Sequence, residues 1–173
     1  MFTPQGNQLH KPDSTAFKRY FYGILLLGII LRVLCLIFNS DISRDGIVYL
    51  QQSEILAQTG WNDFFKIEDA VRLRPPLYLS LIACGINFGL PAKTTGMAIA
   101  MICGIVLPVV IQKLAWELSR DAEFSLWNML IAACFPYFCR MSADILRDGI
   151  YLTLLALFLL YLVRSCLQPT RLN

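Results

Sequence analysis

Two short stretches about a hundred residues apart carry the same reactive side chains in nearly the same order. Residues 41–50 read Asp-Ile-Ser-Arg-Asp-Gly-Ile-Val-Tyr-Leu, and residues 144–152 read Asp-Ile-Leu-Arg-Asp-Gly-Ile-Tyr-Leu. Each sets two carboxylates and an arginine at the border of an apolar run, which predicts catalysis at a membrane surface. Helix capping is the competing interpretation, because Asp before an apolar run often accepts from free backbone N–H groups. For each aspartate taken alone, the two interpretations carry equal weight.

Composition indicates an integral membrane protein. Of the 173 residues, 57% are hydrophobic and 16% are charged, against about 25% charged in a typical soluble domain. The net charge of +3 is small and no basic patch suggests a nucleic-acid partner, so we expect none. The six cysteines lie almost all in apolar segments without metal-ligand spacing, which is typical of packing residues.

Apolar runs predict an all-α membrane module over residues 20–167, with about four transmembrane helices. These helices are expected near residues 20–38, 94–116, 124–143 and 149–167. Each is close to the roughly 20 residues that cross a bilayer. Residues 77–90 are too short and predict a re-entrant or interfacial segment within an outer loop, 39–93. Residues 1–19 and 168–173 are expected to be an N-terminal cytoplasmic tail and a C-terminal tail.

The outer loop is expected to hold two amphipathic juxtamembrane helices. From Gly46 onward the apolar side chains fall on one helical face, and Glu54 and several glutamines fall on the other, which suits an interfacial helix. Gly60 should end this helix. Trp61 and Phe64 then predict a second short helix with an aromatic face at headgroup depth.

The distribution of Lys and Arg favours four crossings and a cytoplasmic N-terminus, because basic residues gather on the cytoplasmic side. Four crossings leave only Arg140 and Arg147 on a short outer loop, whereas five would nearly abolish this bias. Four crossings also place both acidic stretches on one outer face, in the plasma membrane or, in a eukaryote, the endoplasmic reticulum. Arg32, inside the first predicted span, could snorkel, pair within the protein or enter a polar cavity, and we favour snorkelling or pairing.

The order of motifs along the chain is typical of a known family. An apolar helix precedes Arg44-Asp45-Gly46-Ile47-Val48-Tyr49, and then come Arg74-Pro75-Pro76-Leu77-Tyr78, a Gly-rich span, a polar loop at 117–123 and a second acidic motif. Over about residues 20–164, this order resembles the N-terminal module of the type C glycosyltransferases. The likeness is greatest to the protein-mannosyltransferase-like family 39 and the lipid A aminoarabinose transferases. Arg74 stands where members commonly have His or Glu.

The resemblance implies roles for charged residues at the membrane border. Asp45 stands where the family has its catalytic carboxylate, and Asp148 matches the second acidic motif. Many members have two adjacent acids at the first position, but here Gly46 fills the second place. A two-carboxylate site would therefore draw on another acid: Asp41, Asp144 or Asp148. The implied substrate-binding residues are Asp41, Arg44, Arg74, Tyr78, Asp144 and Arg147.

The implied reaction transfers a sugar from a polyprenyl-phosphate donor to a protein, lipid or glycan acceptor on the outer or luminal face. A hydroxyl acceptor is a poor nucleophile, so a carboxylate base helps, and Asp45 is the candidate. Arginines on that side could stabilise the leaving phosphate, although each could equally be an ordinary headgroup contact. The spacing neither requires nor excludes a divalent cation, Mg²⁺ or Mn²⁺, as cofactor.

Family members usually continue for many more membrane helices, so the resemblance implies a truncated or partial member. The competing hypothesis is a non-catalytic membrane scaffold or a small transporter subunit, because internal repeats with polar residues at matching depth occur in transporters. Against that hypothesis, the repeated acids lie at span borders and not in mid-bilayer.

Overall fold

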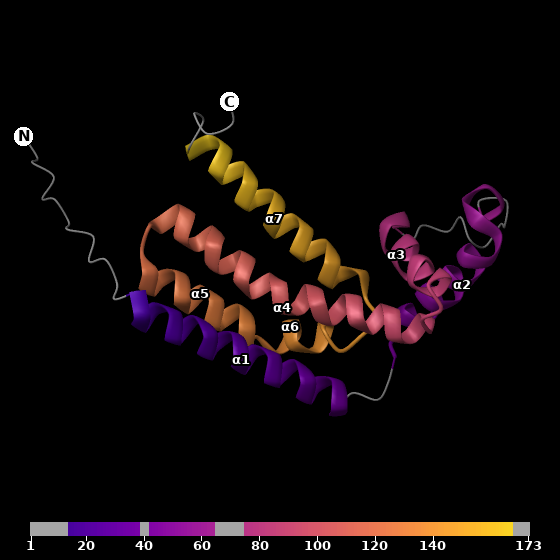
Figure 1. Ribbon diagram of the computed structural model, residues 1–173, viewed down its shortest axis with the longest axis horizontal. Coiled ribbons are helices and arrows are strands. Elements are labelled where there is room, and N and C mark those ends of the chain that lie inside the picture. The colour runs from indigo at the N-terminus through magenta and orange to yellow at the C-terminus, as the bar shows by residue number, and fades with distance from the viewer. Residues whose placement is uncertain (1–13, 39–41, 65–74, 168–173) are drawn as a thin grey trace, which may run out of the picture.

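The described part of the chain, residues 14–38, 42–64 and 75–167 of a computed structural model, consists of seven α-helices and no strands (Figure 1). This confirms the expected all-α class. The helices are α1 (Ser14–Phe38), α2 (Arg44–Phe64), α3 (Pro76–Asn87), α4 (Ala92–Ser119), α5 (Ala122–Cys134), α6 (Pro136–Met141) and α7 (Arg147–Leu167).

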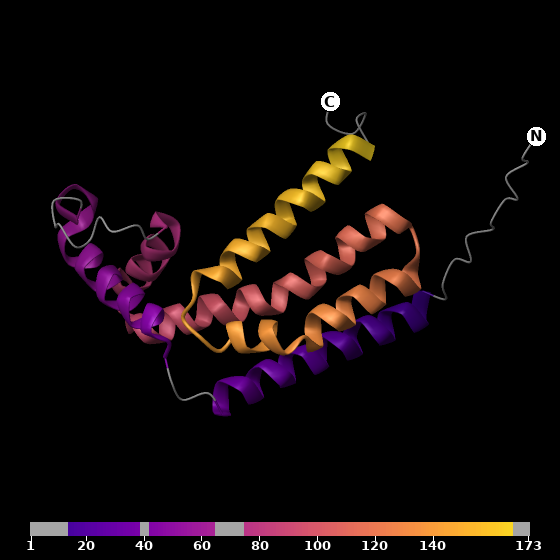
Figure 2. The same ribbon diagram turned by 180° about the vertical axis from the view of Figure 1, so that it is seen from behind.

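Three of these helices, α1, α4 and α7, are long and apolar enough to cross a membrane, and they support the predicted membrane protein. Each extends beyond its predicted span, and α1 begins at Ser14, inside the predicted N-terminal tail. α4 runs in the opposite direction to α1 and in the same direction as α7, as both views show (Figures 1 and 2). Leu107, Val110, Ala156 and Leu160 form the apolar contact between α4 and α7.

The predicted span over 124–143 is not one continuous helix. It is divided into α5, of 13 residues, and α6, of 6 residues, each too short to cross alone. Phe135 separates them with φ −62° and ψ 119°, and Pro136 begins α6. Proline has no N–H to donate to the carbonyl four residues earlier, and it disfavours a helical conformation of the preceding residue. α4 continues through Pro108, but at Pro136 the extended Phe135 divides the helix. The segment predicted as a span over residues 124–143 is thus a pair of helices, α5 and α6, with a break at Phe135.

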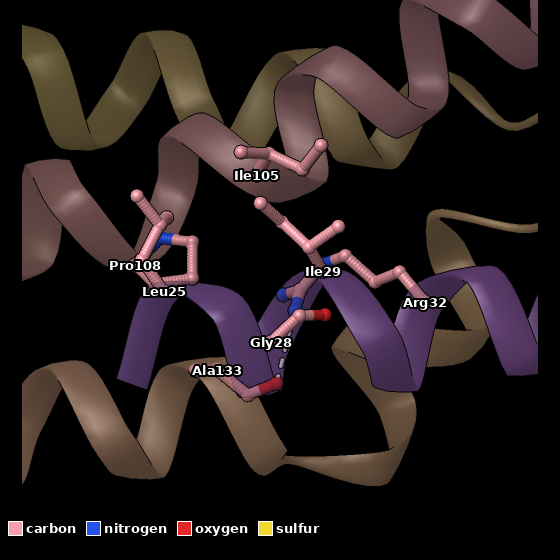
Figure 3. A pocket seen from close by; sticks show the side chains of 7 residues that line it. All are labelled: Leu25, Gly28, Ile29, Arg32, Ile105, Pro108 and Ala133. Atoms are coloured by element: carbon pink, nitrogen blue, oxygen red, sulfur yellow. Dashed lines mark hydrogen bonds between the residues drawn. The ribbon is translucent and has the colours of Figure 1, made fainter. Parts of the chain in front are cut away.

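Arg32 of α1 lies against this break and is fully buried, with 0% of its surface exposed. Its Nη1 donates to the carbonyl oxygens of Gly28 and Ala133, both at 2.9 Å (Figure 3). Its Nη2 lies 3.5 Å from the carbonyl oxygen of Ala132. The favoured interpretation of Arg32 as snorkelling or internally paired is resolved as internal pairing, with backbone carbonyls as the partners.

α2 and α3 pack together beyond the end of the bundle at which α1 ends and α7 begins (Figures 1 and 2). α3 has 12 residues and is too short to cross, which agrees with the non-spanning segment predicted there. The rings of Tyr49 and Tyr78 join the two helices in an edge-to-face contact at 5.1 Å. The buried apolar core of this lobe comprises Tyr49, Leu56, Phe64, Tyr78, Leu79, Ile82, Ala83, Ala92 and Ile145.

The predicted faces of α2 are confirmed, but its apolar face packs on protein. Tyr49 and Leu56 are buried and Glu54 is exposed, as the helical spacing indicated. Gly60, with φ 71° and ψ 171°, produces a kink at the predicted helix end. Phe64, in the aromatic face after the kink, is only 2% exposed and therefore packs against protein.

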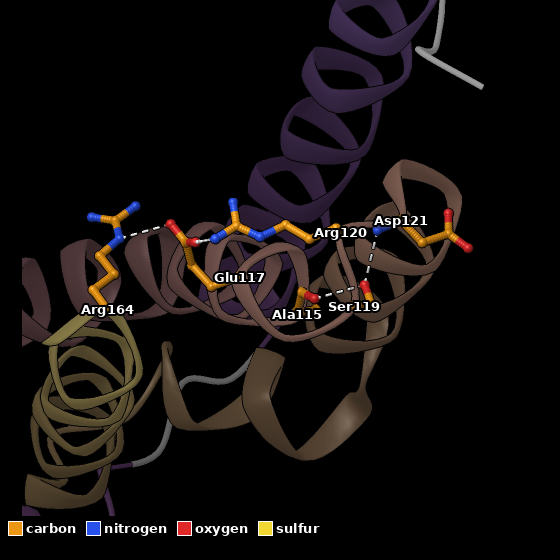
Figure 4. Close-up of polar contacts among 6 residues, drawn as sticks. All are labelled: Ala115, Glu117, Ser119, Arg120, Asp121 and Arg164. Atoms are coloured by element: carbon orange, nitrogen blue, oxygen red, sulfur yellow. Dashed lines mark hydrogen bonds and ion pairs between the residues drawn. The ribbon is translucent and has the colours of Figure 1, made fainter. Parts of the chain in front are cut away.

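An ion-pair cluster joins α4 to α7 at the opposite end of the bundle. Glu117 of α4 is only 8% exposed. Its Oε1 lies 2.9 Å from Nε of Arg164, and its Oε2 lies 2.7 Å from Arg120 (Figure 4). The Glu117–Arg164 pair therefore holds the last turn of α7 on α4.

Replacing Glu117 with Gln should destabilise the protein by about 1–3 kcal/mol, because a largely buried carboxylate would lose its charge-assisted bonds to two arginines. Thermal unfolding in detergent would measure the loss. Glu123→Gln, at an exposed carboxylate near the same end, is the control and should change the melting temperature little. Equal shifts for the two variants would contradict a stabilising cluster.

Candidate functional site

The two acidic motifs lie against each other. The backbone N–H of Ser43, in the first motif, donates to Oδ1 of Asp144, in the second, at 3.2 Å. The same oxygen accepts from the N–H of Ile145 at 2.7 Å. The expectation that the two motifs meet is therefore confirmed, and the start of α2 is joined to the segment that leads into α7.

The capping residue of α2 is Ser43 and not an aspartate. Its Oγ accepts from the N–H of Gly46 at 3.1 Å, which satisfies one of the free donors of the first turn. Asp45 is therefore not needed as the cap, although its carboxylate in the first turn is favoured by the positive end of the helix. The capping interpretation of the first motif is corrected in this respect.

Charged side chains of both motifs face outward around this contact. Arg44 and Asp45 are exposed in the first turn of α2. In the first turn of α7, Arg147 Nε lies 3.7 Å from Asp148 Oδ1, and each side chain is about half exposed. The two helix starts thus present carboxylates that can accept a proton and guanidinium groups that can bind phosphate or carboxylate.

Asp144 lies beneath these exposed groups. It is only 8% exposed, and both described hydrogen bonds to its carboxylate come from backbone N–H groups. This geometry makes Asp144 a residue that orients the chain, whereas the family resemblance implied that it binds substrate.

Gly46 explains why the first motif has one acid where the resembled family often has two. A Cβ at Gly46 would lie 2.7 Å from Ile42 Cγ2 and 3.1 Å from the carbonyl oxygen of Ile145. An acidic side chain there would need the two motifs to separate, and its carboxylate would start beside a carbonyl of like polarity. The position therefore has little room for any side chain, acidic or not, unless Ile42 and the carbonyl of Ile145 shift.

Tyr78 forms the floor of the site. Its ring is 1% exposed, and its hydroxyl has no hydrogen-bond partner among the described residues. Burial raises the pKa of the Tyr78 phenol, and Tyr49 and Asp144 nearby raise it further. The phenol is thus held neutral, and its O–H remains able to donate a hydrogen bond beside Asp144.

Two predicted site residues, Asp41 and Arg74, lie outside the described residues. Within the described ranges, no three His, Cys, Asp or Glu side chains gather closely enough to hold a metal ion. The sequence reasoning missed Ser43, although a serine immediately before a helical segment is a usual cap signal. It also left Arg32 without a partner, because both contacted carbonyls of α5 lie about a hundred residues away.

Asp144→Asn should keep the two motifs together, because an amide oxygen can still accept from the N–H of Ser43. Asp144→Ala removes the acceptor and should weaken the contact by about 1–3 kcal/mol, the usual cost of an unsatisfied donor. Hydrogen exchange at the start of α2 would compare the two variants. If the alanine variant protects these amides as well as the asparagine variant does, Asp144 does not hold α2.

Comparisons with known proteins do not assign a family. No protein-family model matches the chain, and neither a curated protein nor a solved structure shows significant similarity to it. The resemblance to type C glycosyltransferases therefore stays a prediction that depends on the order of the motifs.

Proposed function

We propose that this chain is a membrane glycosyltransferase, or the N-terminal module of one, that uses a polyprenyl-phosphate sugar donor. The observation that carries the proposal is the hydrogen bond from Ser43 to Asp144. It brings two acidic motifs to one end of the apolar bundle. In a membrane that the bundle crosses, the exposed carboxylates and guanidinium groups at this end would lie close to the lipid headgroups. A site that acts on a lipid-linked phosphate needs these groups at this depth.

In the proposed topology, α5 and α6 together make a fourth crossing, so the N-terminus of α1 and the C-terminus of α7 share the cytoplasmic side. Both views support this arrangement, since α5 and α6 continue in one direction alongside α1 (Figures 1 and 2). The acidic motifs and the α2–α3 lobe then lie on the outer or luminal side. A broken helix is tolerated at membrane depth where its free backbone groups are satisfied by protein, and Arg32 provides such bonds.

The proposed mechanism uses Asp45 as the general base. Its carboxylate takes the proton of an acceptor hydroxyl on a protein, lipid or glycan while that oxygen attacks the anomeric carbon of the sugar. A glycosidic C–O bond forms, the bond from the anomeric carbon to the phosphate oxygen breaks, and polyprenyl phosphate leaves with the electron pair. The exposure of Asp45 supports this role, because a base must reach a substrate that arrives from outside the protein.

Arg44 and Arg147 are proposed to bind the donor phosphate. Arginine suits this role because its planar fork donates to two phosphate oxygens at once. Oδ1 of Asp148 lies 3.7 Å from Nε of Arg147, and this weak attraction between two half-exposed side chains would favour some orientations of the guanidinium over others. As negative charge builds on the leaving phosphate, these contacts would strengthen and lower the barrier. Asp148 then has a role in orienting Arg147 as well as its implied catalytic role.

Asp45→Asn should lower transfer by about two or more orders of magnitude while expression and membrane insertion survive. The size of the side chain is kept, and Ser43 still caps α2. Transfer would be measured in membranes with polyprenyl-phosphate mannose as the first donor. Glu54→Gln, which neutralises an exposed carboxylate on the far face of the same helix, is the matched control.

Near-normal transfer by the Asp45→Asn variant would exclude Asp45 as the base. If neither the chain nor a longer protein that contains it transfers sugar from any polyprenyl-phosphate donor in the native membrane, the glycosyltransferase proposal fails. The scaffold hypothesis then takes its place.

A cysteine at residue 146 should react with a membrane-impermeant thiol reagent added from outside, because residue 146 lies between the proposed α5–α6 crossing and α7. The background would carry serine at the two exposed native cysteines, Cys84 and Cys166. A cysteine at 121, at the opposite end of the bundle, should react only after the membrane is permeabilised. The reverse pattern would place the acidic motifs in the cytoplasm.

A further inference from the structure

We propose that Arg32 is a positioning residue for the acidic motifs. Its guanidinium donates to the carbonyls of Ala132 and Ala133 at the break, where Ala133 also accepts from Sγ of Cys139 at 3.3 Å. These contacts keep the segment that carries Asp144 against the start of α2. The proposal concerns the assembly of the two motifs and does not depend on sugar transfer.

The break leaves carbonyl groups at the end of α5 without their usual helical N–H donors. The carbonyl of Ile131 is satisfied, because the N–H of Phe135 donates to it at 2.9 Å. The next carbonyl, that of Ala132, would pair with the N–H of residue 136, and proline has none. Arg32 lies at this carbonyl and at the following one, of Ala133, at 3.5 Å and 2.9 Å.

The chemistry of these contacts favours arginine over other side chains. Among the described residues, the hydrogen-bond partners of Arg32 are all backbone carbonyls: those of Gly28, Ala132 and Ala133. The negative end of the α5 dipole adds to the attraction for a cation. The planar guanidinium carries several N–H donors and can bind neighbouring carbonyls at the same time, whereas the ammonium of lysine is a single compact charge. A buried charge in a membrane protein is expensive, so its retention here indicates a role.

Close packing at Gly104 links Arg32 to the segment before α7. At Gly104 of α4, an added Cβ would collide with Oγ of Ser142 and would lie 3.0 Å from Nε of Arg32. Ser142 is further held by its own bond to the carbonyl of Phe138, at 2.8 Å. Asp144 follows Ser142 by two residues. The guanidinium, Gly104 and Ser142 therefore form a close-packed path from the break to the acidic motif.

The experiment combines a thiol-protection assay with a double-mutant cycle. A cysteine at Ala143, which is 1% exposed, reports whether the segment stays packed, and mass spectrometry of the labelled peptide separates it from native cysteines. In the full chain in detergent, Arg32→Met should speed labelling at 143 by about tenfold or more, the effect expected when buried carbonyls lose their donors. Arg164→Met, at the opposite end of the bundle, should lower thermal stability without speeding this labelling.

The cycle tests the role of the missing N–H. Pro136→Ala gives residue 136 an N–H, which can bind the carbonyl of Ala132 once Phe135 adopts a helical conformation. With alanine at 136, Arg32→Met should lower the melting temperature by no more than about half of what it does with proline at 136. Pro76→Ala, at the first turn of α3, is the control proline and should leave the cost of Arg32→Met unchanged.

Unchanged labelling at 143 in a folded Arg32→Met variant would overturn the proposal, as would equal labelling by Arg164→Met. An equal cost of Arg32→Met beside alanine and proline at 136 would also overturn it. If Arg32→Met does not accumulate, Gly104→Ala tests the same path, and it should speed labelling at 143. Its control is Gly23→Ala, because a Cβ at Gly23 meets nothing within 4 Å. Equal labelling by these two variants contradicts the proposal.

Discussion

The fold depends on satisfying backbone carbonyls where a helix is broken inside an apolar bundle. In a bilayer no water can hydrogen-bond a free carbonyl, so each one must find a donor within the protein. Pro136 breaks the helix between α5 and α6, and Arg32 of α1 supplies the donors. In our proposal, this buried cation stabilises the turn by which the chain leaves α5 and reaches the end of the bundle at which α2 begins. Without that turn, Asp144 would not meet the N–H of Ser43.

Much of the architecture could be predicted from local pattern. Apolar runs identified α1, α4 and α7, helical spacing identified the buried face of α2, and Gly60 identified its kink. The prediction of one continuous span over residues 124–143 did not include the break, because a proline inside an apolar run is compatible with either a kinked or a divided helix. The capping serine was overlooked beside the more conspicuous Asp45. The partner of Arg32 and the backbone role of Asp144 could not be predicted, since both depend on contacts between segments about a hundred residues apart.

The site has a buried layer and an exposed layer, which have different chemical roles. The inner layer is buried and largely fixed by backbone: Asp144 accepts from two N–H groups, and Tyr78 packs beneath it against Tyr49. The outer layer, with Asp45, Arg44 and the Arg147–Asp148 pair, is open to whatever arrives at the membrane border. The inner layer joins the start of α2 to the start of α7. The backbone that carries the outer charged residues is therefore fixed, although their side chains are exposed. This division accounts for the near repetition of the motifs together with their different roles.

The hundred-residue separation between Arg32 and its partners has a consequence for how the chain enters the membrane. α1 is synthesised first, and its arginine has no carbonyl of α5 to bind until residues 132 and 133 have emerged. An arginine at the centre of a helix opposes insertion by about 2.5–3.5 kcal/mol, which the many leucines and isoleucines of α1 must outweigh in the meantime. Until then, of its observed partners, the guanidinium has only the carbonyl of Gly28 in its own helix, and its bonds to α5 form after α5 has been made. Correct helix pairing is therefore decided late, and the acidic motifs meet only after it.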